Sequence, residues 1–371
     1  MSLDANFWRG RRALVTGHTG FKGAWLTLWL NVLGARVSAL ALPPEDTPNL
    51  YGLLGLDLER EVLDDLRAAE PIADLVATAQ PEVVFHLAAQ SLVRRSYVAP
   101  SETFATNVVG TANLLDAVRK ARATRAVIVT TTDKVYENLE QGRPFVESDP
   151  LGGHDPYSTS KACTELVVAS YRRSFFAPAG RPRVATVRSG NVIGGGDWSA
   201  DRVVPDIVRA AANGLPVRLR YPHARRPWQH VLEPLAGYLM MAQAMATRPG
   251  FATETLNFAP DPQQAKTVAE LVEAYTAAFG GRPGWVQEPG DHLHEARLLA
   301  LSADNAQAVL GWRPRLEFNE AVAWTADWYD AHRTKAQVRN VSLEQIAAYD
   351  ALLQHDEANR QSLVEKVHSR P

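Results

Sequence analysis

The sequence predicts an α/β protein with a doubly wound parallel sheet, helices on both faces of that sheet, and a smaller C-terminal domain. Over the first half of the chain, short β-branched segments alternate with longer segments of helical periodicity. Beyond about residue 190 the segments shorten and become richer in proline and tryptophan. A chain of 371 residues has room for about two domains.

The elements follow in order from the apolar pattern. The segment at 12–16 is expected to be a buried strand, and the apolar stripe at 21–33 a helix that ends at Gly34. Further strands are expected at 36–42, 82–87, 126–132 and 183–188, and further helices at 72–79, 103–119, 157–175, 201–213 and 231–245.

Three regions are expected along the chain. Residues 1–189 would hold the sheet, and residues 190–335 would form the second domain, although some of its segments can return to the sheet. Residues 336–371 would form a helical tail. Its segment from Ser342 to Gln345 has the form of a capping box, which predicts the start of a last, peripheral helix.

Composition excludes several classes of protein. The 39 Lys and Arg nearly balance the 41 Asp and Glu, so the chain has no global field for nucleic acid or an anionic membrane. Cys163 is the single cysteine, which excludes an internal disulfide and a multi-thiolate metal site. No secretory pattern opens the chain, and its richest apolar run, at 235–246, is too short for a bilayer. We therefore expect a soluble, cytoplasmic protein.

A glycine-rich segment lies between the first strand and the first helix. Gly17, Gly20 and Gly23 stand in a GxxGxxG spacing, which suits a tight turn that brings backbone N–H groups to a pyrophosphate. The alternative is a simple tight turn, but the strand and helix around it favour a dinucleotide site. Strand two lacks a terminal acid for the adenosine ribose, and residues 37–59 hold no Lys or Arg for a 2′-phosphate. The absence of cations favours NAD over NADP.

Tyr157 and Lys161 are four residues apart, so on a helix they share one face. Asp155 and Pro156 suit its N-cap and first position, which places Tyr157 in the first turn. A cation beside a phenol lowers the pKa of the phenol, so tyrosinate could take a proton from a hydroxyl near neutral pH. A solvated helix shows the same spacing by chance, but its place after the nucleotide loop favours a catalytic pair.

Other polar groups are candidates for the same site. Asp133 and Lys134 follow the strand at 126–132, where they could supply an acid and a base or form a surface ion pair. Four arginines lie near Tyr221 and Trp228 and suit a diphosphate and a base, although a solvated arginine face is the alternative; they are Arg218, Arg220, Arg225 and Arg226. A faint metal pattern at 292–295 lacks further ligands, so we expect no metal.

Four motifs in order resemble the extended short-chain dehydrogenase/reductase superfamily, whose members have a Rossmann-type fold and act on nucleotide sugars. They are Thr16-Gly-x-x-Gly-x-x-Gly23, His86-Leu-Ala-Ala-Gln90, Asn107-Val-Val-Gly-Thr111 and Tyr157-x-x-x-Lys161. Within it, the segments 17–25, 132–134, 190–198 and 226–230 resemble the family of CDP-glucose 4,6-dehydratases. Thr132-Asp-Lys134 is the discriminating element, because related dehydratases usually carry Glu at position 134 and epimerases lack the pair.

The resemblance implies a reaction. Tyr157, with Thr132 and Lys161, would deprotonate the C4 hydroxyl as the C4 hydride passes to NAD. Lys134 would remove the C5 proton and Asp133 would protonate the departing C6 hydroxyl, after which the hydride returns to C6. The product would be CDP-4-keto-6-deoxyglucose, an intermediate for deoxysugars of surface polysaccharide such as lipopolysaccharide. Lys134 can act as a base only when neutral, which requires burial or nearby cations.

The resemblance also assigns the remaining site residues. The expected cofactor-binding residues besides Tyr157 and Lys161 are Gly17, Thr19, Gly20, Phe21, Lys22, Gly23, Asp65, Leu66, Leu87, Ala88, Ala89, Gln90 and Asn107. The expected substrate-binding residues are Gln90, Asn191, Arg202, Arg226, Gln229 and His294. A homodimer packed through two helices of each subunit is expected. The alternatives are a dehydratase or epimerase for another nucleotide sugar, or an inactive NAD-binding regulator.

Overall fold

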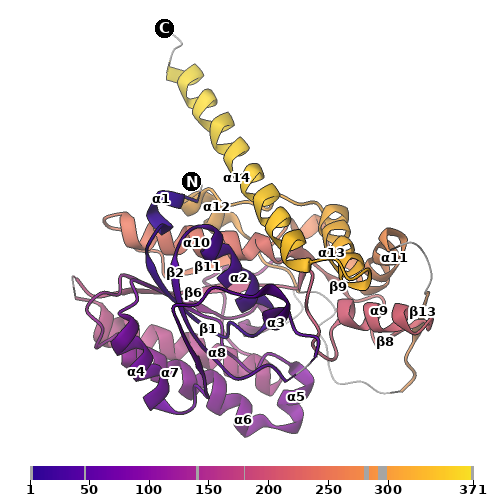
Figure 1. Ribbon diagram of the computed structural model, residues 1–371, viewed down its shortest axis with the longest axis horizontal. Helices are drawn as coiled ribbons and strands as arrows, with labels where there is room; N and C mark the ends of the chain where they lie inside the picture. Colours follow the sequence, from indigo (N-terminus) through magenta and orange to yellow (C-terminus); the bar gives the residue numbers. More distant parts are fainter. Residues whose placement is uncertain are drawn as a thin grey trace.

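The structure is a computed structural model that describes residues 3–45, 47–138, 142–178, 180–279, 284–290 and 299–368, the last 13 of these as helical backbone only. Within these residues the largest element is a sheet of seven strands in the order β11-β6-β5-β4-β1-β2-β3, with every strand pair parallel (Figure 1). Its strands are β1 Arg12–Thr16, β2 Arg36–Ala41, β3 Arg60–Leu63, β4 Val83–His86, β5 Ala126–Thr130, β6 Arg183–Ser189 and β11 Thr255–Phe258. The predicted doubly wound parallel sheet is confirmed.

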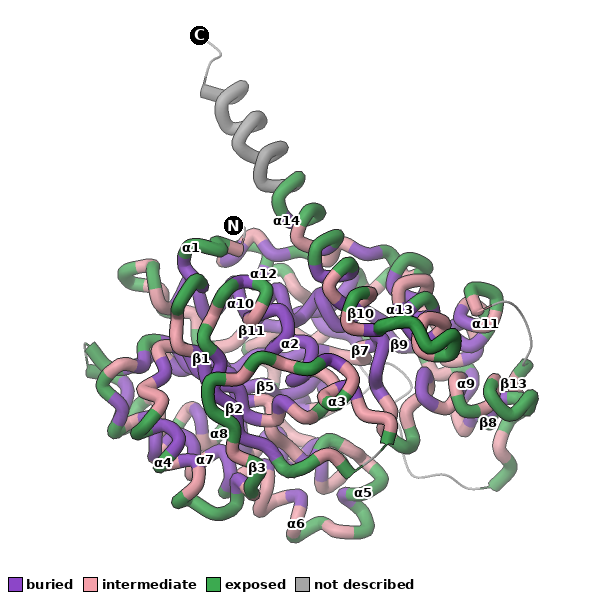
Figure 2. The backbone as a smooth tube through the Cα atoms, viewed as in Figure 1, coloured by how far each residue is buried: buried purple, intermediate pink, exposed green. Residues whose placement is uncertain are grey.

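Alternate residues of the central strands enter two separate apolar cores. In β1, Ala13 and Val15 face one core and Leu14 faces the other, and β4, β5 and β6 repeat this alternation. Both faces are apolar, as expected for a parallel sheet covered by helices on each side. The central strands are accordingly buried, whereas β3 at one edge of the sheet is largely exposed (Figure 2).

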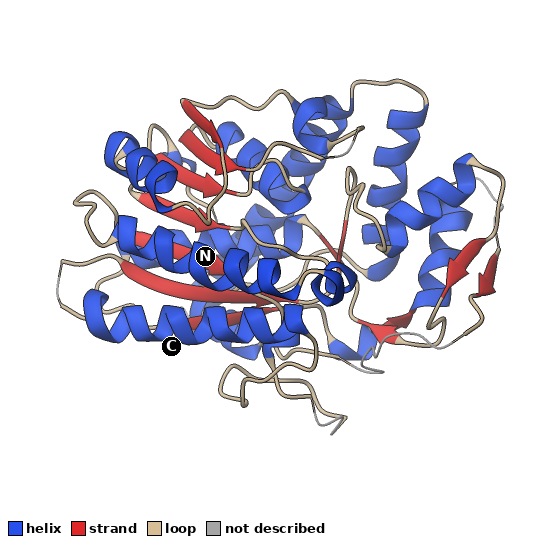
Figure 3. Ribbon diagram, turned by 90° about the horizontal axis from the view of Figure 1, so that it is seen from below, coloured by secondary structure: helices blue, strands red, loops and turns tan. Residues whose placement is uncertain are grey.

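Helices cover both faces of the sheet (Figures 1 and 3). The first core lies under α2 Phe21–Val32 and α10 Leu232–Thr247. The second core lies under α4 Ala69–Ala79, α7 Gly110–Val118 and α8 Pro156–Tyr171. The other helices are α1 Ala5–Trp8, α3 Leu50–Leu54, α5 Val93–Val98, α6 Pro100–Phe104, η1 Ala105–Val109, η2 Asp133–Val135, η3 Arg172–Phe176, α9 Val203–Ala212, η4 Pro262–Gln264, α11 Val268–Ala278, α12 Asp304–Leu310, α13 Phe318–Arg333 and α14 Val338–His368.

The second half of the chain forms short strand pairs outside the large sheet and also adds one helix and one strand to that sheet. In its described part, short strands pair as β7–β10, β9–β12 and β8–β13, and Figure 1 shows β8, β9 and β13 together with α9 and α11 at one side of the molecule. Their bounds are β7 Val192–Ile193, β8 Val217–Leu219, β9 Arg225–Arg226, β10 Gln229–His230, β12 Lys266–Thr267 and β13 Trp285–Gln287. In contrast, α10 packs on the sheet, and β11 extends it by pairing with β6.

Some sequence predictions were wrong in detail. β3 and β11 were not predicted, and the helix expected at 103–119 comprises the end of α6, the π-helical η1 and α7. The predicted capping box is not a cap, because α14 begins at Val338 and Ser342 lies inside it. The Ser342 hydroxyl donates to the Val338 carbonyl (2.9 Å) and accepts from the Trp328 indole (2.9 Å). In the described part of the chain, no helix has the length and apolar composition needed to cross a membrane.

Candidate active site

A cavity of about 980 Å³ opens at the carboxyl edge of the large sheet. Its floor includes the glycine-rich turn after β1 and the segment Leu87–Ala89 after β4. These neighbouring strands connect to opposite sides of the sheet, and parallel sheets bind ligands at such a switch point. Residues of the second half, among them Asn191, Arg202 and Arg226, line the opposite wall. The cavity is therefore built by both halves of the chain.

The glycine-rich turn has no room for side chains at two positions. Gly17 has φ +82°, and a Cβ there would lie 2.7 Å from the Ala88 backbone nitrogen. A Cβ on Gly23 would overlap the Gly17 carbonyl. Gly20 is the N-cap of α2, and no described side chain caps that end of the helix, so its first N–H groups remain available to an anion. These residues fit the pyrophosphate of a dinucleotide.

Most of the predicted cofactor residues meet at this cavity. Besides the three glycines, the lining includes Thr19, Phe21, Lys22, Asp65, Leu66, Leu87, Ala88, Ala89, Tyr157 and Lys161. Lys22 donates to Ser189 Oγ at 2.9 Å, and burial together with the charge of Arg202 lowers its pKa to about 7.

Tyr157 and Lys161 project from the first turns of α8. The predicted N-terminus is confirmed, because Asp155 Oδ1 accepts from the Ser158 backbone N–H at 3.0 Å and Pro156 opens the helix. Lys161 Nζ donates to the Thr130 carbonyl at 2.8 Å, and burial lowers its pKa to about 8. Burial raises the pKa of Tyr157 to about 12, although a hydrogen bond to Thr132 and the charge of Arg202 oppose this. The predicted lowering of the phenol pKa is thus wrong for this state, since desolvation is the largest effect.

Thr132, Asp133 and Lys134 lie together where the chain leaves β5. Asp133 is 1% exposed, and its Oδ1 accepts from Thr132 Oγ1 at 2.9 Å and from Lys134 Nζ at 3.3 Å. Its Oδ2 has no hydrogen-bond partner among the residues that the structure describes. The Lys134 side chain is 32% exposed, so the burial expected of a neutral lysine is only partial. All three residues line the cavity beside Tyr157.

The arginine-rich part of the second half supplies cations to the same cavity. Arg226 is buried, and Arg218 and Arg220 line the wall with Tyr221 and Trp228. Arg225 instead donates to the Ala265 carbonyl at 2.8 Å and is not in the lining. Arg202 donates to Asp197 Oδ2 (3.3 Å) and Ser91 Oγ (3.2 Å). A doubly negative diphosphate suits this set of guanidinium groups.

Three predicted residues lie behind the cavity wall. Asn107 accepts from the Gln90 backbone N–H (2.8 Å) and donates to the Gln90 carbonyl (3.0 Å) and to Ser160 Oγ (2.8 Å), so it supports the backbone of the site. The Gln90 side chain donates to Thr103 Oγ1 at 2.8 Å. Gln229 donates to the Phe258 carbonyl at 3.0 Å. These side chains are not in the cavity lining. His294, also predicted, lies outside the described residues.

Sequence reasoning missed several residues of the cavity wall. Arg94 and Asp201 both line it and form an ion pair at 2.7 Å, yet they are 107 residues apart in the chain. Ser189, the partner of Lys22, is the last residue of β6, and its place at the carboxyl end of a strand was the one signal that could have identified it.

The fold and the site define a class of proteins: Rossmann-fold enzymes with a Tyr-x-x-x-Lys pair. The model of the family described as GDP-mannose 4,6 dehydratase matches residues 14–325, and the chain belongs to that family. Over 89% of its length it is 45% identical to a CDP-glucose 4,6-dehydratase from Salmonella typhimurium, of which it covers 93%. The predicted relationship to nucleotide-sugar dehydratases is confirmed.

Solved structures agree with this assignment. DesIV, a dTDP-glucose 4,6-dehydratase from Streptomyces venezuelae solved with NAD and TYD bound, is 26% identical with a TM-score of 0.74, over 88% of this chain and 98% of that one. An epimerase from Methanothermobacter thermautotrophicus has a TM-score of 0.79 at 22% identity, over 91% and 96% of the two chains. The second likeness concerns the fold alone.

Proposed function

We propose that this protein is an NAD-dependent CDP-glucose 4,6-dehydratase that forms CDP-4-keto-6-deoxyglucose. The observation that carries the proposal is the meeting of two acid–base pairs in one cavity: Tyr157 with Lys161, and Asp133 with Lys134. An epimerase needs the first pair but not an acid and a base for elimination. The Salmonella relative supports CDP-glucose as the substrate, because 45% identity extends over nearly the whole of both chains.

NAD is the cofactor that the cavity supports. The glycine-rich turn would hold its pyrophosphate, and Leu66, Leu87 and Ala88 would line its path along the carboxyl ends of the strands. When bound, NAD supplies a nicotinamide that accepts the C4 hydride and later returns it to C6.

The first chemical step requires removal of the C4 hydroxyl proton. Tyr157 would accept this proton, with Thr132 hydrogen bonded to it and Lys161 held at the Thr130 carbonyl. Because burial favours the neutral phenol, the cations that line the cavity, such as Arg202, must help to lower the cost of forming tyrosinate.

The second step removes water across C5 and C6. The 4-ketone makes the C5 proton acidic, and Lys134 would take that proton through its Nζ. For this step the proton of the Lys134–Asp133 pair must start on Asp133, which leaves Lys134 neutral. Asp133 would deliver that proton to the C6 hydroxyl, which leaves as water, and Lys134 would return its proton to C5 when the hydride reaches C6. The Oδ2 atom of Asp133 suits the delivery to C6, because Oδ1 is already engaged by Thr132 and Lys134 whereas Oδ2 has no partner in the described part of the chain.

A substrate panel tests the proposal. Purified protein is incubated with CDP-, dTDP-, GDP- and UDP-glucose, and the 4-keto product is followed by its absorbance in alkali. We expect the highest kcat/KM with CDP-glucose. A preference for another nucleotide would make the protein a dehydratase of different specificity. Reversal of C4 configuration without loss of water would indicate an epimerase, and inactivity on all four would indicate a regulator.

Two variants separate the chemical steps. Tyr157→Phe should abolish oxidation at C4, so no reduced-nicotinamide absorbance develops in a single turnover. Lys134→Ala should still oxidise C4 but stall afterwards, so that reduced nicotinamide and a 4-keto-hexose accumulate and solvent deuterium does not enter C5. Lys120→Ala, a change at an exposed lysine, is the matched control. Wild-type turnover by Lys134→Ala would remove Lys134 from the role of base.

We also propose that the protein forms a homodimer in the cytoplasm. Val98 (86% exposed), Val109 (50%) and Leu166 (59%) leave apolar side chains exposed on α5, η1 and α8, and α5 and η1 both contact α8. A second copy of the chain would cover them. Light scattering on the purified protein tests the dimer, and Leu166→Glu should then yield a monomer.

A further inference from the structure

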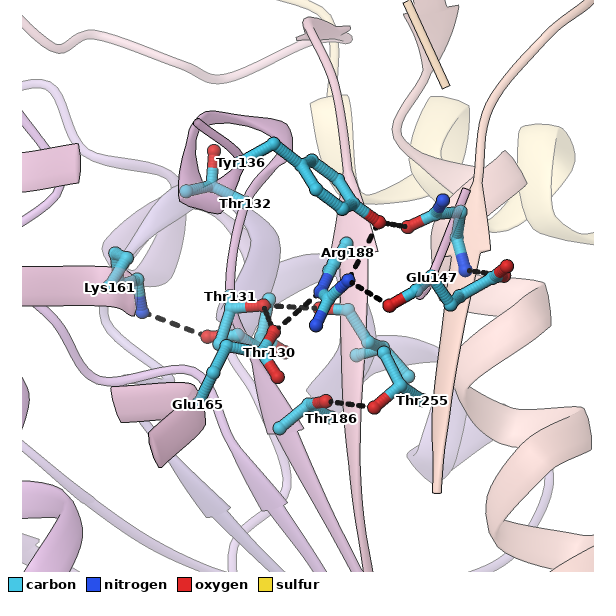
Figure 4. A network of polar contacts seen from close by, with 12 residues as sticks. Thr130, Thr131, Thr132, Tyr136, Glu147, Lys161, Glu165, Thr186, Arg188 and Thr255 are labelled. Carbon is cyan, nitrogen blue, oxygen red and sulfur yellow. Dashed lines mark hydrogen bonds and ion pairs between the residues drawn. The ribbon is translucent and has the colours of Figure 1, made fainter. Parts of the chain in front are cut away.

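A buried polar network lies beneath the segment that presents Thr132, Asp133 and Lys134 (Figure 4). The segment leaves β5 at Thr130 and ends at Tyr136, which is buried against the second half of the chain. The network contacts the segment at both ends. Apart from the contact of Lys161 with the Thr130 carbonyl, none of its side-chain contacts is used by the chemistry described above.

The first end of the segment is held through Thr131. Its hydroxyl donates to Glu165 Oε1 at 2.6 Å, and its backbone N–H donates to the Val187 carbonyl at 2.8 Å. Glu165 Oε1 also accepts from Arg188 Nε at 2.7 Å. The carboxylate and the guanidinium are each only 4% exposed, so this is a fully buried ion pair.

The second end of the segment is held through Tyr136. Arg188 Nη1 donates to the Tyr136 hydroxyl at 2.7 Å, and that hydroxyl donates to Asn257 Oδ1 at 2.8 Å. The guanidinium carbon also lies 4.8 Å from the centre of the Tyr136 ring. A single guanidinium on β6 therefore connects, through Glu165 and Tyr136, the two ends of the segment that carries the proposed acid and base.

Helix α8 carries both Glu165, a member of this network, and the other proposed catalytic pair, Tyr157 and Lys161. Tyr157, Lys161 and Glu165 are spaced four residues apart, so they lie on one face of α8. Lys161 contacts the segment at the Thr130 carbonyl and Glu165 contacts it at Thr131. A buried ion pair adds little to stability compared with apolar residues of the same volume, so its geometry calls for another explanation.

We propose that the Arg188–Glu165 pair is a positioning device that fixes Asp133 and Lys134 relative to Tyr157 and Lys161. This inference rests on the proposed dehydratase function. Tyr157 and Lys161 are held by α8 itself. Asp133 and Lys134 lie in a connecting segment that is held by its two anchored ends, by the Gly152 N–H at the Val135 carbonyl (2.8 Å) and by a backbone bridge between Tyr136 and Leu151. Loosening either end should therefore slow elimination more than C4 oxidation.

Two conservative variants loosen one end each without leaving a buried charge unpaired. Thr131→Val removes the hydroxyl that binds Glu165. Tyr136→Phe removes the hydroxyl that binds Arg188, while the ring can keep its stacking on Phe145, whose centroid is 4.8 Å away. The matched controls are Thr27→Val and Tyr275→Phe, because the hydroxyls of Thr27 and Tyr275 are buried without a hydrogen-bond partner among the described residues.

The experiment is a single-turnover and steady-state comparison with CDP-glucose. We expect kcat to fall at least tenfold in Thr131→Val and Tyr136→Phe with KM changed less than twofold. Reduced nicotinamide and 4-keto-hexose should accumulate, and deuterium should enter C5 more slowly than in the wild type. Both controls should behave as the wild type does.

Three results would overturn the inference. They are an unchanged kcat, a fall in kcat without accumulation of the oxidised hexose, and an equal fall in the controls that follows loss of thermal stability. The wild-type arm distinguishes the two proposals. If wild-type protein dehydrates no nucleotide glucose, the proposed function fails and the inference with it; if the wild type is active, the variants test the positioning role alone.

Discussion

Replacing Glu233 by glutamine should change how the stability of the protein depends on pH. Glu233 lies on α10 and is 1% exposed. Its Oε1 accepts from the backbone N–H groups of Arg315 (2.8 Å) and Leu316 (2.7 Å), and its Oε2 accepts from the Tyr349 hydroxyl of α14 (2.6 Å). Burial raises its pKa from 4.5 to about 7, against the effect of these donors.

The sign and size of the effect follow from this shift. Between pH 4.5 and 7 the folded chain keeps a proton on Glu233 that the unfolded chain has released, so stability falls as pH rises. At about 1.4 kcal/mol for each pKa unit, the full shift removes roughly 3 kcal/mol by pH 8. Glutamine can still accept from both backbone N–H groups and can donate to the Tyr349 oxygen. The free energy of unfolding of Glu233→Gln, relative to that of the wild type, should therefore rise by about 3 kcal/mol between pH 4.5 and pH 8.

Urea denaturation at pH 5, 6, 7 and 8 measures this difference. Wild type and Glu233→Gln are compared with Glu344→Gln, a change at an exposed position of α14, the helix that carries Tyr349. The control should follow the wild-type curve at every pH. If the free energy of unfolding of Glu233→Gln has the same pH dependence as that of the wild type, the pKa of Glu233 is not raised in the folded protein and the reasoning from burial is refuted.

Three other changes are expected at the cavity. Arg226→Ala should raise KM for the nucleotide sugar about tenfold or more with little change in kcat, because loss of a charge-assisted hydrogen bond costs about 1.5–3 kcal/mol. Steady-state kinetics measures both constants, and an unchanged KM would remove Arg226 from the substrate site. NAD but not NADP should restore activity to enzyme from which the cofactor has been removed. The part of the cavity lining that follows β2 and β3 includes Asp64 and Asp65 and no described cation that could bind a 2′-phosphate. Equal activation by NADP would contradict this. Gly17→Ala should weaken NAD binding, measured by calorimetry, and lower Tm. Residue 17 has φ +82°, which disfavours a side chain, and a Cβ there would collide with the Ala88 backbone. NAD binding equal to that of the wild type would mean that the turn can relax.

The sequence predicted those strands that are buried on both faces. β1, β4 and β5 were found because each contains an uninterrupted run of three or four apolar residues, whereas β6 was found from its alternating valines and alanine. β3 was missed because Arg60–Leu63 is a largely exposed edge strand with two charged residues. The capping-box pattern at Ser342 failed for another reason: Trp328, far from it on α13, supplies a tertiary partner for the hydroxyl.

The candidate site was predictable where its chemistry is local in sequence. The glycine-rich turn and the Tyr157–Lys161 spacing depend on a few consecutive residues. The direction of the Tyr157 pKa shift was not predictable, since it depends on burial by segments distant in the chain. The Arg188–Glu165 pair was missed for a similar reason: charged residues within a strand and a helix give no sign that they face each other across the core.

The pairing of β11 with β6 has a consequence for how the protein is made. The large sheet is complete only when residues 255–258 have emerged from the ribosome, although its first six strands end at residue 189. Until then β6 presents a free edge, and the face later covered by α10 exposes apolar residues. A fragment cut at residue 189 would keep that exposed edge permanently. The nascent chain therefore carries an incomplete six-stranded sheet with an exposed edge and an exposed apolar face during the synthesis of nearly 70 further residues. This is the period in which chaperones would have their main opportunity to bind it.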